Sequence, residues 1–380
     1  MQSRLDRNPL ADWWWTVDRL MFVLIILLMV TGIVLGLAGS PPVAERLGLP
    51  TFHFVIRQAV NLAPAFVVMM IASFMTPRLV RRTAMALYLV GMALVVATLI
   101  FGTEVKGAKR WITILGFALQ PSEFVKPAFI ILVAWAFSEG GRRKDVPGNI
   151  LGVLLLVGTI GPLVLQPDIG QTMLIAMAWA GIVFLSGLHL FWVFGIGGIG
   201  AAGLAAAYKF LPHVRDRIDR FRNPEAGDTF QVDNAMQSFI EGGWFGKGPG
   251  EGTIKRILPD SHTDFVFAVT AEEFGIIACL ALLAVFAIVV LRGLYLARQN
   301  EEPFCRLAAS GLVILFGIQA SINMAVNVHL IPAKGMTLPF ISYGGSSLIS
   351  LGLAMGFLLA VTRRRPRADY VDRFRAEQEE

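Results

Sequence analysis

Residues able to do chemistry gather just before a long apolar run in this chain. Residues 258–275 read LPDSHTDFVFAVTAEEFG and contain one histidine and four carboxylates, namely His262, Asp260, Asp264, Glu272 and Glu273. Ionisable groups in a bilayer cost about 2.5–3.5 kcal/mol each even on lenient insertion scales, so several in one segment indicate a site. Asp264, at the first turn of the expected helix, is the candidate general base, because partial burial makes a carboxylate a better proton acceptor at neutral pH. The alternative is a helix cap. His262 is the rival base, and it is equally suited to orienting a substrate or to an ordinary surface position.

Two further carboxylate groups indicate structural ion pairs. Glu272 and Glu273 lie about two turns deeper than Asp264, where exposure to lipid is unfavourable, so we expect each to pair with a basic residue or a hydroxyl in the bundle. Glu123 and Lys126 are three residues apart, a spacing that places both on one helix face. We expect an internal ion pair that shapes a cavity, and direct substrate contact is the second interpretation.

Basic residues and helix starts favour an anionic ligand. Lys334 and Ser342 lie in HLIPAKGMTLPFISYGGSS (329–347), which resembles an anion-binding turn, although a re-entrant structural loop explains it equally well. Lys109 and Arg256 add positive charge in two other connections. Asp168 in QPDIGQT begins a helix, as QPSE and LPDS do elsewhere, and capping alone explains such starts. Because these helices are expected to begin on one side of the membrane, their positive ends would converge on a phosphate-bearing substrate.

The composition places most of the chain in lipid. The 380 residues are 55% hydrophobic and 16% charged, with a mean hydropathy of +0.64, which exceeds what one soluble core can bury. The net charge of +6 matches basic loops retained in the cytoplasm, so nucleic-acid binding is not favoured. The two cysteines show no metal-ligand spacing and predict no disulfide. The first apolar run is too long for a signal peptide and is interpreted as a retained span.

We predict an all-α integral membrane protein with about ten transmembrane helices. The spans are expected at about 20–38, 54–75, 84–101, 124–138, 150–165, 170–187, 190–208, 265–291, 307–330 and 340–361. Basic clusters after the second, fourth, eighth and tenth spans place both termini in the cytoplasm. The chain is thus a single membrane domain, 1–380, with a cytoplasmic tail at 1–19, helices 1–7 within 20–208, helices 8–10 within 263–362 and a second tail at 363–380.

One connection, 209–262, is far longer than the others and is expected on the extracytoplasmic side between helices 7 and 8. Its segment HVRDRIDRFRNPE favours an amphipathic helix, while GGWFGKGPGEGT is typical of a shaped, glycine-rich loop. A solvated connector is the simpler alternative.

The motifs KGAKRW (106–111), QPSEFVK (120–126), QPDIGQT (166–172), 246–275 and 329–347, in this order, resemble the SEDS family of bacterial cell-wall polymerases over nearly the whole chain. AKGMTLPFISYGGSS, with Lys334, is more similar to the cell-division branch, FtsW, than to the elongation branch, RodA. The resemblance implies a peptidoglycan glycosyltransferase that polymerises lipid II at the outer face of the cytoplasmic membrane at the division septum. It places Asp264 at the family's essential aspartate, Glu123 and Lys126 at its paired residues, and His262 and Lys334 in its outer cavity.

The resemblance also implies partners: a class B penicillin-binding transpeptidase (FtsI-like) and divisome proteins of the FtsQ, FtsL, FtsB and FtsN kinds. The chemistry expected is one inverting displacement, with Asp264 as base and with Lys334, Arg256, Lys109 and helix N-termini stabilising the leaving diphosphate. A divalent cation, Mg²⁺ or Mn²⁺, is left open as an addition, and no protein metal ligand is assigned. Two other hypotheses remain: a lipid II flippase, and a non-catalytic divisome scaffold in which Asp264 is replaceable.

Overall fold

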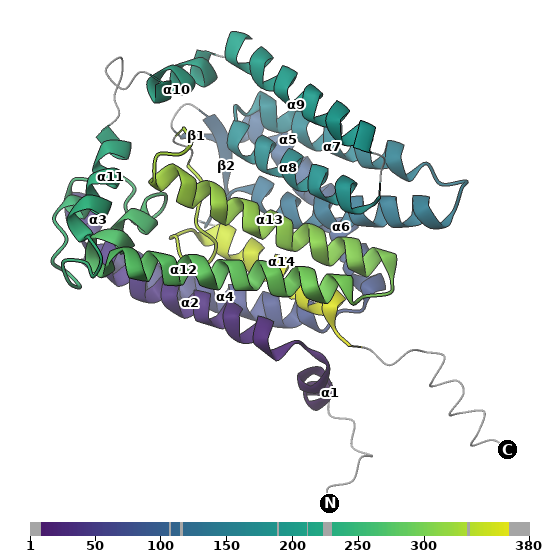
Figure 1. The fold of residues 1–380 in the computed structure, drawn as a ribbon, viewed down its shortest axis with the longest axis horizontal. Helices are drawn as coiled ribbons and strands as arrows, with labels where there is room; N and C mark the ends of the chain where they lie inside the picture. The colour runs from purple at the N-terminus through teal and green to yellow at the C-terminus, as the bar shows by residue number, and fades with distance from the viewer. Residues whose placement is uncertain are drawn as a thin grey trace, which may run out of the picture.

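The computed structural model describes residues 9–105, 108–114, 117–187, 190–210, 212–222, 230–332 and 335–364. Each of the ten expected spans coincides with a helix of a single bundle (Figure 1): α2 (Arg19–Gly39), α4 (His53–Ser73), α5 (Pro77–Phe101), α6 (Pro121–Arg142), α7 (Gly148–Leu165), α8 (Ile169–Leu185), α9 (Leu190–Phe210), α12 (Val266–Arg298), α13 (Pro303–Asn327) and α14 (Gly345–Thr362). Within the described residues, eight of these are long and apolar enough to cross a membrane. The 17-residue α8 is shorter, and α9 is only partly described, so the exact number of crossings stays a prediction.

The helices of the bundle alternate in direction, so successive helices begin at opposite ends of it. At one end, here the site end, α4, α6, α8, α12 and α14 begin; the short helices α3 (Pro41–Arg46), α10 (Pro212–Arg222) and α11 (Phe230–Gly242) lie there too. At the other end, here the basic end, lie α1 (Pro9–Thr16), the arginine-bearing start of α5 and the arginine-bearing ends of α6 and α12, together with the end of α14 (Figure 1). This segregation agrees with the charge pattern used to orient the chain.

Three short strands between α5 and α6 were not expected from the sequence. β1 (Thr103–Val105), β2 (Ala108–Ile114) and β3 (Phe117–Leu119) form an antiparallel sheet in the order β1-β2-β3. Thr103 pairs with Trp111, and Ile112 pairs with Leu119. The sheet presents β2 and β3 residues toward the start of α6.

α14 is the central helix of the bundle. Its most apolar stretch is 89% buried, more than that of α13 or α6. Small residues permit close contact with α4: a Cβ added at Gly352 would lie 2.3 Å from the carbonyl oxygen of Ala65, and one at Gly356 would lie 2.6 Å from that of Met69. The N-terminus of α14 is therefore held in the middle of the site end.

α12 is broken at Gly275, where the sequence predicts one continuous apolar helix. Gly275 has φ +80°, a conformation that favours glycine. The amides of Ile276 and Ile277 donate instead to the carbonyls of Gly243 and Trp244, at 2.9 and 3.3 Å. The glycine-rich loop thereby replaces the hydrogen bonds that the break removes.

The two deep carboxylates hold the same loop. Glu272 accepts backbone N–H bonds from Thr253 (2.5 Å) and Ile254 (2.7 Å) and from Lys255 (3.0 Å), at the short 3₁₀ helix η2 (Ile254–Arg256). Glu273 forms a buried ion pair with the side chain of Lys255. The structural interpretation is confirmed for both, except that the partners of Glu272 are backbone amides rather than a side chain.

Candidate active site

Asp264 lies at the start of α12 without being its capping residue. The helix begins at Val266, with Phe265 at the N-cap position, so the alternative interpretation as an N-cap is wrong. Two buried asparagines of α13 hold the turn instead. The Nδ2 atoms of Asn323 and Asn327 each donate to the carbonyl oxygen of Asp264 at 2.9 Å, and Oδ1 of Asn327 accepts the N–H of Ala268 at 3.0 Å. These bonds fix the backbone that carries the candidate base.

Asp264 faces a large cavity at the site end. The cavity has a volume of about 980 Å³, and residues of α4, β2, β3, α6, α8 and the 335–347 segment line it with the Asp264 turn. Four predicted site residues line it: Asp264, His262, Glu123 and Asp168. The side chain of Asp264 is partly exposed, as a group that must meet a substrate has to be. Residues far apart in the sequence therefore form one site.

His262 packs against two aromatic rings. Its ring centroid lies 4.5 Å from that of Phe54 and 5.5 Å from that of Tyr343. Its carbonyl oxygen accepts the N–H of Tyr343 at 3.0 Å. This bond ties the Asp264 turn to the segment that leads into α14.

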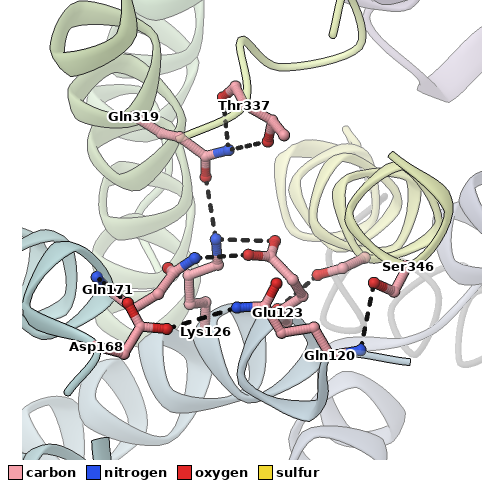
Figure 2. Close-up of polar contacts among 9 residues, drawn as sticks. Gln120, Glu123, Lys126, Asp168, Gln171, Gln319, Thr337 and Ser346 are labelled. Carbon is pink, nitrogen blue, oxygen red and sulfur yellow. Dashed lines mark hydrogen bonds and ion pairs between the residues drawn. The ribbon is translucent and has the colours of Figure 1, made fainter. Parts of the chain in front are cut away.

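Glu123 and Lys126 form the expected internal ion pair, shown in Figure 2. Nζ of Lys126 lies 2.9 Å from Oε2 of Glu123, and the two side chains are only 3% and 5% exposed. Gln171 of α8 donates to Oε1 of Glu123 at 2.7 Å, and Lys126 donates to Oε1 of Gln319 of α13 at 3.2 Å. Gln319 in turn donates to the carbonyl oxygen of Thr337 at 3.1 Å. The pair therefore joins α6, α8 and α13 to the 335–347 segment beneath the cavity.

Asp168 is the N-cap residue of α8 and the partner of an arginine. Its Oδ1 accepts the N–H of Gln171 at 3.3 Å and lies 3.7 Å from Nη1 of Arg110 on β2. Burial raises the pKa of Asp168 above its usual value, against the lowering effect of Arg110. Arg110 also donates to the carbonyl oxygen of Pro167 at 2.6 Å, so its guanidinium is engaged in holding the 166–168 turn.

Three further predicted site residues, Ser342, Lys109 and Arg256, do not line the cavity. Ser342 is buried, and its hydroxyl accepts the N–H of Leu338 at 2.7 Å, which holds a turn. Lys109 on β2 and Arg256 on η2 are exposed away from the cavity. Lys334 lies outside the described residues. None of these placements tests substrate contact directly, so the predicted roles stay predictions.

Several residues that shape the site were not singled out in the sequence. Arg57 and Asn61 of α4 line the cavity, and Asn323 and Asn327 hold the Asp264 turn. A signal was available for Arg57, because an arginine inside an apolar span is costly unless it faces a polar cavity. The asparagines gave a weaker signal of the same kind.

Comparison with known proteins decides the family. The model of the FtsW, RodA and SpoVE family, described as "Cell cycle protein", matches residues 18–367. The chain belongs to this family. A Caulobacter vibrioides member named "Probable peptidoglycan glycosyltransferase FtsW" is 46% identical over 367 residues, covering 96% of this chain and 94% of that protein. A Trichlorobacter lovleyi member of the same name is 34% identical, covering 91% of this chain and 93% of its own length.

Solved structures share the FtsW/RodA/SpoVE fold. One chain, from a study of structural coordination of polymerization and crosslinking by a peptidoglycan synthase complex, matches with a TM-score of 0.77 and 28% identity, covering 91% of this chain and 97% of its own. The Thermus thermophilus rod shape determining protein RodA matches with a TM-score of 0.68 and 26% identity, covering 93% of this chain and 99% of its own. The expected SEDS-type, mostly helical membrane fold is therefore confirmed.

Proposed function

We propose that this chain is a peptidoglycan glycosyltransferase that polymerises lipid II into glycan strands during septal cell-wall synthesis. The observation that carries the proposal is the position of Asp264, a partly exposed carboxylate on a rigid turn, in a cavity of about 980 Å³. Support comes from relatives that are named probable peptidoglycan glycosyltransferases and match along almost their whole length.

The proposed reaction is a single in-line displacement. The acceptor sugar hydroxyl forms a bond to the anomeric carbon of the donor, and the bond from that carbon to the diphosphate oxygen breaks. Asp264 takes the hydroxyl proton, and the electron pair of the broken bond leaves with the diphosphate. One displacement inverts the α-linked donor into a β-linked product. His262, close to the same turn, would orient the acceptor.

The buried groups have a supporting role in this scheme. Glu123, Lys126 and Asp168 fix the cavity wall from α6 and α8 through the bonds described above. Lys334 stays a predicted contact to the leaving diphosphate. The described residues hold no group of three or more His, Cys, Asp or Glu side chains placed to bind a metal ion, so no step is routed through a divalent cation.

The proposed setting is the cytoplasmic membrane at the division septum, with the site end outside and both termini in the cytoplasm. The basic connections at the opposite end support this orientation. A structural relative from a study of a peptidoglycan synthase complex supports a transpeptidase partner. We take that partner to be FtsI-like, and FtsQ, FtsL, FtsB and FtsN-like proteins to be further divisome partners.

Reconstitution separates the proposal from its rivals. The purified chain, its transpeptidase partner and lipid II are combined in detergent, and the products are resolved as glycan chains on a gel. The proposal expects chains with the wild type and none with Asp264→Ala. Lipid II movement across vesicles without chain formation would favour a flippase, and neither activity would favour a scaffold.

A further inference from the structure

We propose that the first turn of α14 and Arg57 of α4 form the subsite that binds the diphosphate of the lipid-linked sugar. The inference rests on the proposed function for the identity of the ligand, but diphosphate binding is measurable without turnover. It narrows the predicted anion-binding turn at 329–347 to Gly344–Ser347 and adds Arg57, which the sequence did not single out.

The start of α14 is an uncapped helix N-terminus that opens into the cavity. α14 is 18 residues long, its N-cap residue is Gly344, and no side chain caps its first turn. Gly344, Gly345, Ser346 and Ser347 all line the cavity. The amides and the positive end of the helix macrodipole thus face the space that a substrate enters, which is the usual setting for a bound phosphate.

Ser347 supplies an independent indication of a ligand. Its side chain is only 7% exposed, and its Oγ atom has no hydrogen-bond partner within the part of the chain that the structure describes. The residue nevertheless lines the cavity. A Cβ added at Gly344 would lie 2.6 Å from this oxygen, so the hydroxyl occupies the space beside the N-cap that a side chain would fill. A buried hydroxyl of this kind is costly unless something binds it.

Arg57 supplies the charge. It lies one turn from Asn61 on α4, both residues line the cavity, and Arg57 makes no ion pair with any of the described residues. Nδ2 of Asn61 lies 3.3 Å from the position of a Cβ built on Gly345, which places this face of α4 against the α14 start. Arg110, the other arginine of the cavity wall, is already engaged by Asp168 and two backbone carbonyls.

The proposed subsite is connected to the candidate base. Tyr343, the residue before Gly344, donates its N–H to His262, two residues before Asp264, at 3.0 Å. A Cβ added at Gly335 would lie 3.0 Å from Oδ2 of Asp264, so the same 335–347 segment borders the carboxylate. A diphosphate held at the α14 start would therefore place the attached anomeric carbon on the side of the cavity that carries Asp264.

Binding of farnesyl diphosphate to the detergent-purified full chain tests the subsite directly. We expect Arg57→Gln to weaken binding about tenfold or more, because an ion pair to the diphosphate is lost, and Ser347→Ala about threefold, because one hydrogen bond from an uncharged hydroxyl is lost. Arg78→Gln, at an exposed arginine of the basic end that makes no ion pair with the described residues, is the matched control and should bind as the wild type does. Inorganic diphosphate as competitor separates headgroup recognition from binding of the prenyl tail.

Equal affinities of the wild type, Arg57→Gln and Ser347→Ala would overturn the subsite, as would no detectable binding to the wild type. If Arg57→Gln does not fold, Ser347→Ala decides, because it removes a single oxygen atom. Asp264→Asn should still bind farnesyl diphosphate, at least as tightly as the wild type because it removes a negative charge near the diphosphate, while failing to polymerise. If the subsite variants polymerise lipid II and bind diphosphate as the wild type does, this inference alone is refuted. If binding depends on the subsite but the chain never polymerises lipid II, only the proposed function is refuted.

Discussion

The buried pair of Glu123 and Lys126 makes a quantitative prediction about stability. The side chains are 5% and 3% exposed, and among the described residues each has one further hydrogen-bonding side chain, Gln171 for the carboxylate and Gln319 for the ammonium. Removing one charge leaves the other buried and uncompensated, which typically costs about 3–5 kcal/mol. Glu123→Gln and Lys126→Met should therefore each destabilise the protein by about that amount.

The double variant should cost no more than either single one, because it leaves neither member of the pair charged without the other. The double-mutant cycle then gives a coupling free energy of at least about 3 kcal/mol. The measurement is denaturant-induced unfolding in mixed micelles, followed by tryptophan fluorescence. A matched control lies on the same helix: Arg143 and Glu139 are 3.8 Å apart, with Arg143 68% exposed, and their coupling should stay below about 0.5 kcal/mol. Additive losses at Glu123 and Lys126 would refute the reasoning.

Two further predictions concern other buried contacts. Glu272→Ala should leave the three amides of residues 253–255 without their hydrogen-bond acceptor, which costs about 1–3 kcal/mol for each amide and should accelerate their hydrogen exchange. The control Glu251→Ala, in the same loop, should leave this exchange unchanged. Equal exchange rates in the two variants would contradict the bonds described. At Asp18, burial would raise the pKa, but hydrogen bonds from Arg292 and a backbone amide outweigh it and lower the pKa below 3.8. The ionised Asp18 therefore stabilises the fold above pH 3.8, and this stabilisation is lost as the pH falls through the lower pKa of the folded state. Asp18→Asn should flatten the dependence of the unfolding free energy on pH in this acid range. An unchanged dependence would exclude the Asp18–Arg292 pair as its source.

Much of the fold follows from local properties of the sequence. Apolar runs of spanning length predict all ten bundle helices, because hydropathy depends on nearby residues alone. The boundaries were less accurate: α5 begins at Pro77 rather than near residue 84, and α12 continues to Arg298. Polar helix ends extend beyond the lipid, and the apolar pattern does not report them.

The site was only partly predictable because it depends on contacts across the chain. Asp264 and His262 are two residues apart in the sequence, and helix direction predicted that the helices starting near Glu123, Asp168 and Asp264 begin on one side; the structure adds that these residues line one cavity. The break at Gly275 was not predicted, because the hydrogen bonds that compensate for it come from a loop about thirty residues earlier in the chain. Lys109 on β2 is exposed and is not among the residues that line the cavity, so its predicted contact with the substrate stays a prediction.

The most direct test of the central claim is the rate at which Asp264→Asn polymerises lipid II in the presence of the transpeptidase partner. Binding of farnesyl diphosphate to the same variant checks that the cavity is intact. Asparagine keeps the size of the side chain and the backbone bonds from α13, but it removes the proton acceptor. The account predicts a loss of about 100-fold or more, as expected for a missing general base, with diphosphate binding at least as tight as in the wild type. Polymerisation at the wild-type rate would contradict it.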